Sequence, residues 1–358
     1  MDKHIVVIGA GIIGASIAYH AAKRGGRVTL LDKALPAGEA SGHSFAWINA
    51  SAGNARPYYD LRLHAIQDWH RLERELEGAI DINWGGRLEW CDDQQELLSS
   101  VAKSRSWGYP MRLLKRHEIE ELEPNLAAPP EIAALAELEG TLDPPEVTAV
   151  LLQRFKAQGG ELITNCEVRG LAAGNGGTRI ETTLQDALQA DHLVIAAGKT
   201  TQELAGMLDV LVPMKTLAGC LMVTEASEPL LNRAVMTPGL HMKQMASGAI
   251  VAGEDFGGGS LELGVEQAGQ ELLRRLEARL KTTGALKLAK ILKGIRPIPK
   301  DGWPVIGPAL TKPPLYIATM HSGVTLAALT GRLAAQEILD AVACDLLDAF
   351  RPSRFGAA

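Results

Sequence analysis

The stretch HIVVIGAGIIGASIAYHAAKRGGRVTLLDK, residues 4–33, predicts a strand, a glycine turn, a helix and a second strand that ends in an acid. Residues 5–8 are apolar and β-branched, as is typical of a parallel strand buried on both faces. Gly9, Gly11 and Gly14 follow with the spacing G-x-G-x-x-G. These glycines permit a tight turn, close approach of the backbone to a pyrophosphate, and close packing of the helix on its strand. The stretch therefore predicts a dinucleotide-binding βαβ unit.

The acid at the end of the second strand narrows the choice of dinucleotide. Asp32 follows the apolar run 28–31 and is placed to accept hydrogen bonds from a ribose diol. Its negative charge disfavours a 2′-phosphate, so NADP is not expected. A glycine-rich turn in an unrelated α/β protein would leave Asp32 without a role. The residues alone leave both nicotinamide and flavin dinucleotides open.

Length, charge and cysteine usage bound the class of protein. At 358 residues the chain can form two domains, and its net charge of −6 offers no basic excess to attract nucleic acid. No run of about 18 apolar residues is free of charge, so no membrane span is expected. The four cysteines are scattered without a C-x-x-C pair. That pattern suits a reducing cytoplasm and predicts neither a disulfide framework nor a metal site.

Changes in the sequence pattern predict two interleaved domains. Asp143 is expected to cap a helix that begins with prolines, and residues 315–319 are expected to form a strand before a long helix that follows Gly323. Between these segments, short strands alternate with single helices. The dinucleotide-binding domain is expected to comprise residues 1–80, 140–212 and 293–358, and the substrate-binding domain residues 81–139 and 213–292.

Five further segments carry a resemblance to a known family. They read GEASGHSFAWINAS (38–51), GTLDPPEVTAVLLQRFKAQGGE (140–161), HLVIAAGKTT (192–201), GIRPIPKDGWPVIGP (294–308) and MHSGVTLAALTGRLAAQEIL (320–339). In this order they resemble the D-amino-acid oxidase, glycine oxidase and sarcosine oxidase family of FAD-dependent oxidoreductases. The resemblance implies an α/β fold, in which an FAD-binding, Rossmann-like domain of the glutathione-reductase type is interleaved with an α+β substrate domain built on an antiparallel sheet.

The resemblance implies that the dinucleotide is FAD. The N-terminus of the long helix that HSGVT opens would place backbone N–H groups and partial positive charge at the flavin N1/O2 edge, where reduced flavin is negative. Some members attach flavin through a cysteine near the final loop, but residues 294–297 contain none, so noncovalent FAD is expected. The residues expected to contact FAD are Gly9, Gly11, Ile12, Ile13, Gly14, Asp32, Lys33, Ala40, Ser41, Gly42, His43, Val168, Ala197, Gly198, Gly323, Val324 and Thr325.

The resemblance also implies a substrate site. In members that oxidise amino acids, the arginine of a G-x-R-P stretch pairs with the substrate carboxylate, which makes Arg296 the candidate here. Lys243 and His241 are the other candidate catalytic residues, and Trp47 fits a pocket wall or the core equally well. The implied reaction oxidises the C–N bond of an amino acid or secondary amine. A hydride passes to flavin N5, an imine leaves, and no general base is required.

The acceptor and the partners are less narrowly defined. Sarcosine-oxidase-like members carry a lysine near the flavin where this chain has Glu262, and loss of that cation should slow the reaction with oxygen. A dehydrogenase is therefore slightly favoured over an oxidase. A small-molecule substrate is expected, together with a homo-oligomer or a partner subunit. A nicotinamide-dependent dehydrogenase and a flavin-bearing subunit of a multi-subunit dehydrogenase remain as alternatives.

Overall fold

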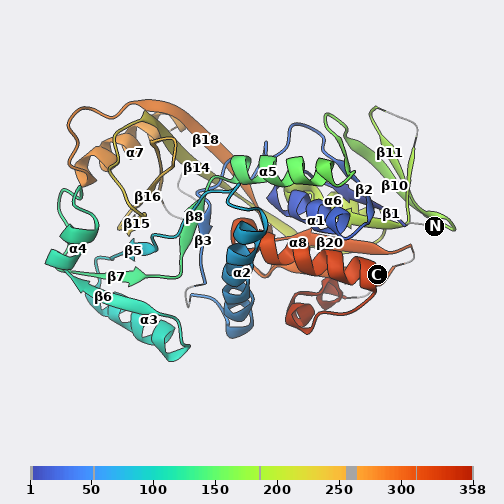
Figure 1. Cartoon of the computed structure of the whole chain (residues 1–358), viewed down its shortest axis with the longest axis horizontal. Coiled ribbons are helices and arrows are strands. Elements are labelled where there is room, and N and C mark those ends of the chain that lie inside the picture. The colour runs from blue at the N-terminus through green and yellow to red at the C-terminus, as the bar shows by residue number, and fades with distance from the viewer. Residues whose placement is uncertain (1–2, 51–52, 185–186, 255–263, 312, 357–358) are drawn as a thin grey trace.

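Two large sheets lie toward opposite ends of the molecule, with α2 between them (Figure 1). The computed structural model describes residues 3–50, 53–184, 187–254, 264–311 and 313–356. Its α-helices are α1 (Ile12–Lys23), α2 (Arg56–Glu75), α3 (Gln94–Ser106), α4 (Arg116–Leu122), α5 (Pro144–Ala157), α6 (Thr201–Gly206), α7 (Val265–Arg279) and α8 (Gly323–Asp340). Short 3-10 helices are η1 (Gly198–Thr200), η3 (Asp345–Phe350) and η4 (Pro352–Phe355).

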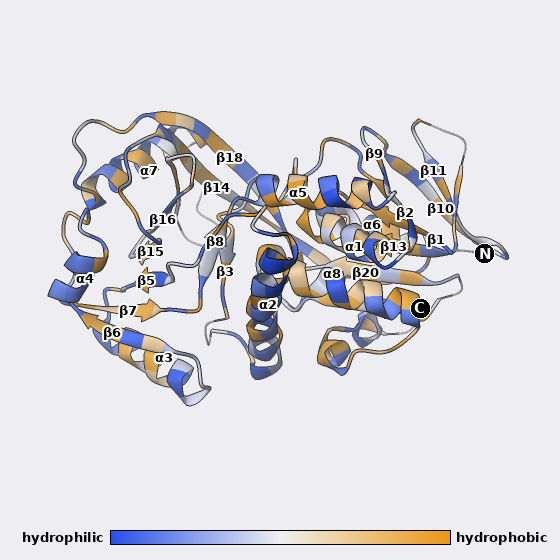
Figure 2. Ribbon diagram, in the orientation of Figure 1, coloured by the Kyte–Doolittle hydropathy of each residue, from blue (hydrophilic) through white to orange (hydrophobic). Residues whose placement is uncertain are grey.

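The six-stranded sheet contains the predicted βαβ unit. Its order is β19-β20-β13-β1-β2-β9, and neighbouring strands are parallel except for β19 and β20. Val6 and Val7 of β1 are completely buried, as expected for a strand covered on both faces. Figure 2 shows hydrophobic residues gathered around this sheet, whereas α2 is largely hydrophilic. The strands are β1 (His4–Ile8), β2 (Arg27–Leu31), β9 (Glu161–Ile163), β13 (His192–Ile195), β19 (Val305–Ala309) and β20 (Leu315–Thr319).

Close packing of α1 on α8 brings the starts of these two helices together. The Ser16 hydroxyl of α1 donates to the carbonyl oxygen of Ala327 in α8 at 2.8 Å. Gly331 permits this approach, because a Cβ at that position would overlap Ser16. At the start of α8, a Cβ on Gly323 would lie 3.6 Å from Ile13 Cγ1. The N-termini of α1 and α8 therefore lie side by side.

The eight-stranded sheet has the order β18-β14-β17-β16-β15-β5-β7-β6, and only its β15–β5 pair is parallel. The long strands β14 and β18 reach from this sheet toward the other end of the molecule (Figure 1). Helix α7 packs on the sheet and buries Leu272 and Leu276. The strands are β5 (Arg87–Glu89), β6 (Met111–Lys115), β7 (Ile132–Ala136), β14 (Met214–Ala226), β15 (Ala234–Thr237), β16 (Leu240–Gln244), β17 (Ala249–Gly253) and β18 (Leu288–Pro299).

Two small sheets complete the fold. One has the order β10-β11-β12, with a turn between Gly174 and Gly177, which pair with each other. The other has the order β3-β8-β4 and joins segments that are distant in sequence. Their strands are β10 (Val168–Gly174), β11 (Gly177–Thr182), β12 (Leu188–Ala190), β3 (Trp47–Ile48), β8 (Gly140–Leu142) and β4 (Ile82–Asn83).

The distribution of strands follows the segments proposed from the sequence. The six-stranded sheet draws its strands from residues 1–80, 140–212 and 293–358. The eight-stranded sheet draws on 81–139 and 213–292, although β18 continues past the second boundary. We propose these two sets of segments as domains. The α/β class with a parallel sheet is confirmed, and none of the described helices combines the length and apolarity that a membrane span requires.

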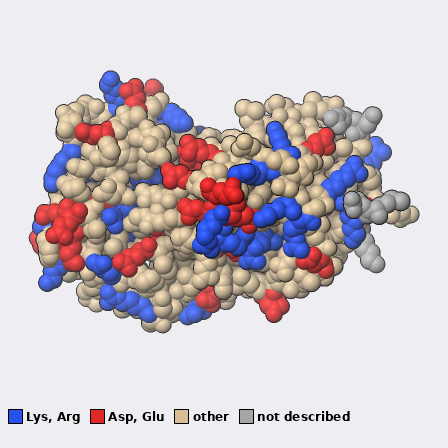
Figure 3. All heavy atoms as spheres, in the orientation of Figure 1, with Lys and Arg blue, Asp and Glu red and all other residues tan. Residues whose placement is uncertain are grey.

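Charged side chains of both signs lie next to one another over the face shown in Figure 3. Asp68 of α2 accepts from Arg71 of the same helix at 2.8 Å and from Arg332 of α8 at 2.7 Å. Burial alone raises the pKa of Asp68, but the hydrogen bonds and charges of both arginines lower it below its ordinary value. The Asp68–Arg332 pair holds α2 against α8, whose first turn belongs to the site described next.

Candidate active site

A cavity of about 580 Å³ is lined by residues of both large sheets. The glycine turn after β1 and the loop after β2 form one end, and β14, β16 and β18 form the other. The first turn of α8 and residue Arg62 of α2 also line it. Small-molecule sites typically measure roughly 300–1,000 Å³, so the cavity has a suitable size. It brings together segments that are far apart in the chain.

The glycine turn forms a backbone cradle at the first end. Gly9 has φ +105°, and a Cβ there would lie 2.5 Å from the carbonyl oxygen of Ala196. Glycine alone fits this position without moving the backbone. Gly11 is the N-cap of α1 and supplies no side-chain cap. The first N–H groups of α1 thus lack intrahelical acceptors, and a helix end of this kind binds phosphate groups well.

Two side chains from outside α1 complete this cradle. Ser41 Oγ accepts from the N–H of Ile12 at 3.0 Å, and Asp32 Oδ2 accepts from the N–H of Ala10 at 2.6 Å. Asp32 Oδ1 accepts from the N–H of Ala34 at 2.8 Å. Asp32 therefore fixes the glycine turn while lining the cavity, a second role that the sequence did not indicate.

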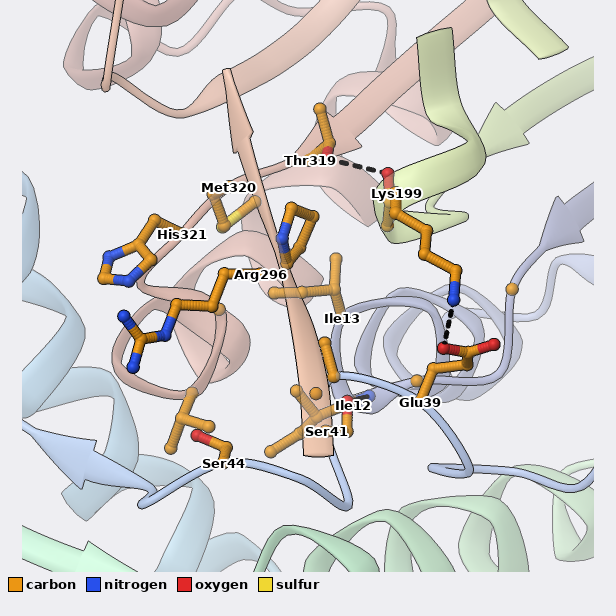
Figure 4. Close-up of a pocket in the computed structure, with 18 of the residues that line it drawn as sticks. Ile12, Ile13, Glu39, Ser41, Ser44, Lys199, Arg296, Thr319, Met320 and His321 are labelled. Atoms are coloured by element: carbon orange, nitrogen blue, oxygen red, sulfur yellow. Dashed lines mark hydrogen bonds and ion pairs between the residues drawn. The ribbon is translucent and has the colours of Figure 1, made fainter. Parts of the chain in front are cut away.

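A small cluster of ionic side chains lines the same end. Glu39 Oε2 accepts from Lys199 Nζ at 2.6 Å, as Figure 4 shows, and Glu39 Oε1 lies 3.4 Å from Lys33 Nζ. Partial burial raises the pKa of Glu39, but the hydrogen bond and charge of Lys199, with the charge of Lys33, lower it overall. Glu39 is therefore ionised at neutral pH.

The first turn of α8 is held in place from two sides. The indole N–H of Trp69 in α2 donates to the carbonyl oxygens of Val324 and Thr325, at 3.0 Å each. Thr325 Oγ1 donates to the carbonyl oxygen of Trp47 at 3.0 Å and accepts from the N–H of Asn49 at 3.3 Å. The N-cap side chain of α8 makes no capping hydrogen bond. The partial positive charge of this helix end thus faces the cavity.

A buried arginine lies beside this turn. Arg62 is 7% exposed, and it donates from Nε to the carbonyl oxygen of Asn49 at 3.0 Å and from Nη2 to Asn49 Oδ1. Its guanidinium lies 5.4 Å from the centroid of the Tyr58 ring. Within the described part of the chain, Arg62 forms no ion pair with a carboxylate. The cavity therefore contains a desolvated positive charge that is held by neutral groups.

Arg296 reaches the cavity from β18. Strand pairing places Arg296 opposite Leu217 of β14 and places Gly294 opposite Gly219. A Cβ on Gly219 would lie 2.9 Å from Arg296 Nη2, so the missing side chain makes room for the guanidinium. Figure 4 shows the Arg296 side chain on the other side of the pocket from the Glu39–Lys199 pair.

His321 lies in the turn between β20 and α8, and its side chain is accessible from the cavity. Figure 4 shows its imidazole on the same side of the pocket as the Arg296 guanidinium. Desolvation by the surrounding protein, followed by the positive charges of Arg296, Arg62 and Lys215, lowers the pKa of His321 to about 4. The imidazole is therefore neutral at pH 7 and can accept a hydrogen bond or a proton.

His241 and Lys243 both belong to β16, and both side chains contact the ring of Phe45. His241 lines the cavity and makes an edge-to-face contact with Phe45, with the ring centroids 4.6 Å apart. Lys243 is not among the lining residues; its Nζ lies 5.6 Å from the centroid of the Phe45 ring and donates to the carbonyl oxygen of Leu142 at 2.7 Å. Burial lowers the pKa of Lys243 to about 7, although the charge of Asp143 acts in the opposite direction.

Trp47 forms part of the cavity wall and is anchored by a buried carboxylate. Glu139 is completely buried, and its Oε2 accepts from Trp47 Nε1 at 2.7 Å and from Arg87 Nε at 2.8 Å. Glu139 Oε1 accepts from the Tyr109 hydroxyl at 3.0 Å. The sequence left open whether Trp47 forms a pocket wall or part of the core. In the structure Trp47 lines the cavity, while its indole N–H is hydrogen-bonded to the buried Glu139.

Most of the residues expected from the sequence line this one cavity. Gly14, Gly42 and Lys243 do not: a Cβ on Gly14 would overlap the carbonyl oxygen of Gly9, and one on Gly42 would overlap that of Ala37, so these glycines serve backbone packing. Glu262 lies outside the described residues. The expected residues that line the cavity are Gly9, Gly11, Ile12, Ile13, Asp32, Lys33, Ala40, Ser41, His43, Val168, Ala197, Gly198, His241, Arg296, Gly323, Val324 and Thr325.

Several charged or polar lining residues were not expected from the sequence, among them Glu39, Arg62, Lys199 and His321. Glu39, Lys199 and His321 belong to segments that carry the resemblance, which was the available signal for them. Arg62 has no such signal, because it lies in the middle of an amphipathic helix. All four cysteines are free, and no group of three or more His, Cys, Asp or Glu residues in the described part of the chain could hold a metal ion.

Comparison with known proteins relates this geometry to a family. Residues 4–337 match the family model described as FAD dependent oxidoreductase. A glycine oxidase of Geobacillus kaustophilus (strain HTA426) is 25% identical over 345 residues, covering 92% of this chain and 91% of that protein. A monomeric sarcosine oxidase of Bacillus sp. (strain B-0618) is 23% identical over 278 residues, covering 76% of this chain and 71% of that protein. The crystal structure of glycine oxidase from Geobacillus kaustophilus superposes with a TM-score of 0.87 at 24% identity, covering 98% of this chain and 99% of that chain.

These matches confirm three predictions: the FAD-binding, Rossmann-like fold with a substrate domain, the cofactor FAD, and oxidoreductase activity. They do not favour the nicotinamide-dependent alternative. The family model spans both large sheets and the first turn of α8, which are the parts of the chain that line the cavity. The chain belongs to the FAD-dependent oxidoreductase family that includes D-amino-acid oxidase, glycine oxidase and sarcosine oxidase.

Proposed function

We propose that the protein oxidises the C–N bond of a small amino acid or secondary amine that carries a carboxylate, and that the product is an imine. One observation carries this proposal. A single cavity connects the glycine turn at Gly9, which suits a dinucleotide, with Arg296, which suits a carboxylate. The first turn of α8 lines the same cavity, so cofactor and substrate can meet there.

The residues at the first end fit FAD. The glycine turn, in which a Cβ at Gly9 would meet the Ala196 carbonyl oxygen, and the N-terminus of α1 suit the pyrophosphate. Asp32 is placed for the adenosine ribose, and Val168 for the adenine. The α8 N-terminus at Gly323 suits the pyrimidine edge of the flavin. Bound FAD supplies the two-electron acceptor, and we expect it to be noncovalent.

The residues at the second end would bind and orient the substrate. A guanidinium holds a carboxylate through two parallel hydrogen bonds and stays charged when water is excluded. Arg296 can therefore fix the substrate carboxylate, while Trp47 and His241 limit the space around it. Fixing the substrate at one carboxylate holds its α-carbon in a defined place, and this positioning accounts for much of the catalysis in such enzymes.

The positive charges of the site suit a reaction that adds negative charge to the cofactor. Arg62 is buried, and the N-terminus of α8 lines the cavity beside it. Charges that are already in position stabilise developing negative charge without reorganisation of solvent. We therefore expect both groups to favour acceptance of the hydride.

Replacement of Arg296 tests the proposal. Arg296→Met should leave the yellow FAD-bound protein intact but raise the Kd of carboxylate substrates in anaerobic flavin reduction about 10- to 150-fold, the equivalent of roughly 1.5–3 kcal/mol for charged hydrogen bonds. Arg296→Lys should recover part of this loss. The exposed Arg112 of β6 supplies the control, because Arg112→Met should change nothing. An unchanged Kd in Arg296→Met would remove the carboxylate role.

We further propose that an acceptor other than oxygen reoxidises the flavin. The proposal rests on Glu262 in place of the lysine found in sarcosine-oxidase-like members. Stopped-flow mixing of the substrate-reduced protein with oxygen or with an artificial electron acceptor tests it. Reoxidation by air within the time of one turnover would establish an oxidase instead.

The predicted homo-oligomer or partner subunit and the cytoplasmic location stay predictions. Light scattering on the yellow protein measures the oligomeric state. Purification of the tagged protein from its native cells tests for a stable partner subunit. Neither result bears on the chemistry at Arg296.

A further inference from the structure

The His321 side chain has a position that the reaction proposed above leaves unused. It opens into the cavity, and neither ring nitrogen has a hydrogen-bond partner among the described residues. Figure 4 shows the imidazole beside the guanidinium of Arg296. A polar group at the wall of a ligand cavity without a protein partner is a candidate to bind the ligand.

Among the residues that the structure describes, the charged groups that act on this ring are all positive. Those that act on it are Arg296 of β18, Arg62 of α2 and Lys215 of β14, and they combine with desolvation to lower the pKa of His321 to about 4. The ring is thus neutral when substrate arrives at pH 7. It can accept a proton or an N–H hydrogen bond, whereas a protonated ring could only donate.

An α-amino acid bound through its carboxylate to Arg296 would bring a protonated nitrogen close to His321. The carboxylate and the ammonium group of an α-amino acid are attached to the same carbon, so a carboxylate held by Arg296 brings the nitrogen close to the neighbours of Arg296. At pH 7 that nitrogen is protonated, and its lone pair is needed when the α-hydrogen leaves as hydride. An ammonium group near His321 would also be repelled by Arg62, whose positive charge acts on that ring. The proton must therefore leave before hydride transfer.

We propose that His321 accepts this proton and is the general base of the reaction. The step converts ammonium and neutral imidazole into neutral amine and imidazolium. The freed nitrogen lone pair would form the C=N bond as the α-carbon loses its hydride, for which bound FAD would supply the acceptor, and the product would be a protonated imine. The imidazolium returns its proton to water after the product departs. This inference rests on the proposed function.

Substrate itself would make the base stronger. When a carboxylate pairs with Arg296, the positive charge that most strongly opposes protonation of His321 is neutralised. The imidazole therefore becomes more basic only in the complex that needs it. In the empty site, the same cations keep the ring neutral and ready.

The pH dependence of anaerobic flavin reduction at low substrate concentration tests the proposal. The wild-type second-order rate constant should be level from about pH 6 to pH 9, because the zwitterion and the neutral imidazole are both abundant. In His321→Asn, only substrate that is already deprotonated can react. Its rate constant should rise about tenfold per pH unit up to the pKa of the substrate ammonium group. Parallel profiles in the two proteins would overturn the proposal.

A second measurement does not depend on turnover. 2-Methylalanine has no α-hydrogen, and its binding to the FAD-bound protein can be followed by titration calorimetry at pH 7 in two buffers of different ionisation enthalpy. The wild type should release no proton, because His321 keeps it, whereas His321→Asn should release about one. Release of a proton by the wild type, or none by the variant, contradicts the proposal.

Matched variants separate this role from a structural one. His64 is an exposed histidine of α2 outside the cavity, and His64→Asn should retain the level wild-type profile. His321→Gln provides a second substitution, and the visible spectrum reports whether each variant holds FAD. Release of a proton by the wild type would overturn the proposal even if both variants lost FAD. If no amine or amino acid reduces the wild-type flavin, the proposed function fails instead.

Discussion

The two ends of the cavity are built in different ways. At the dinucleotide end, Gly9, Gly11 and Asp32 lie within one short stretch and act mainly through the backbone that they shape. At the substrate end, Arg62 comes from α2, Arg296 from β18 and a histidine from the turn before α8, and they act through side chains. The dinucleotide end therefore depends on the spacing of residues that are close in sequence. The substrate end forms only when distant segments come together in the folded protein.

The two ends also differ in charge. The acidic residues that line the cavity in the described part of the chain, Asp32, Glu39, Glu167 and Glu203, belong to the dinucleotide end. The arginines Arg62 and Arg296 lie at the other. An electropositive substrate end suits a carboxylate and a cofactor that gains negative charge, whereas the mixed end can hold a ribose as well as a pyrophosphate. The comparison predicts that substitutions at one end spare the function of the other.

The largest effect is expected at Gly9. In Gly9→Ala, the backbone must hold an alanine at φ +105°, and the added Cβ would lie 2.5 Å from the Ala196 carbonyl oxygen. We expect the purified protein to be colourless and not to bind added FAD, as measured by its visible spectrum. Gly25→Ala is the control, because Gly25 has φ +84° but open space around it. It should cost about 1–2 kcal/mol of stability and stay yellow. A yellow Gly9→Ala protein would show that the cradle tolerates a side chain.

The second effect concerns the substrate end. Glu139→Gln removes the buried charge that binds Arg87 and anchors Trp47. Breaking a buried pair typically costs about 3–5 kcal/mol, which denaturant unfolding measures. Affinity for FAD should be kept, while the Kd of substrate rises. Glu131→Gln is the control, because its pair with Arg116 is exposed to solvent and should contribute little to stability. If Glu139→Gln weakened FAD and substrate equally, the two ends would not be separable.

Features that depend on neighbouring residues were predictable from the sequence. The strand predicted at 315–319 has the bounds of β20, and Asp143 caps α5 by accepting from the N–H of Glu146 at 3.4 Å. Gly9 and Gly11 of the predicted glycine turn line the cavity, and the G-x-G-x-x-G spacing by itself indicated a special backbone there. Propensity and spacing act over a few residues, so such predictions need no knowledge of the tertiary structure.

Side-chain assembly could not be predicted in the same way. Lys243 lies two residues from His241 on β16, so alternation placed both on one face of the strand. Only the fold shows that Phe45, nearly 200 positions earlier, packs against both and closes the cavity in front of the lysine. The HSGVT segment likewise pointed to a helix start, but not to the cations that keep His321 neutral.

A third prediction separates burial from catalysis at Lys243. The pKa of Lys243 is lowered from its ordinary value of 10.5 to about 7 in the folded protein. Between these two pH values the unfolded chain therefore binds more protons than the folded protein. The contribution of Lys243 to the free energy of unfolding thus rises with pH in this range. Lys243→Met should therefore gain stability over the wild type most at pH 7 and least near pH 10, as thermal unfolding measures. Lys290→Met, at an exposed position of β18, should show no such trend. If Lys243→Met lost substrate affinity and its stability difference from the wild type did not change with pH, Lys243 would have a role in binding substrate.

The smallest effect is expected at Glu39, where a substitution changes the charge of the dinucleotide end but hardly changes its shape. Glu39→Gln leaves Lys33 and Lys199 beside the site without their carboxylate partner. FAD carries negative charge, so its Kd should fall, by up to about fivefold or ~1 kcal/mol at low salt, as expected for an exposed pair. The difference should vanish in about 0.5 M salt because screening weakens such interactions. Substrate affinity should not change. Weaker FAD binding at every salt concentration would mean that Glu39 acts by ordering the loop after β2 rather than by neutralising the lysines.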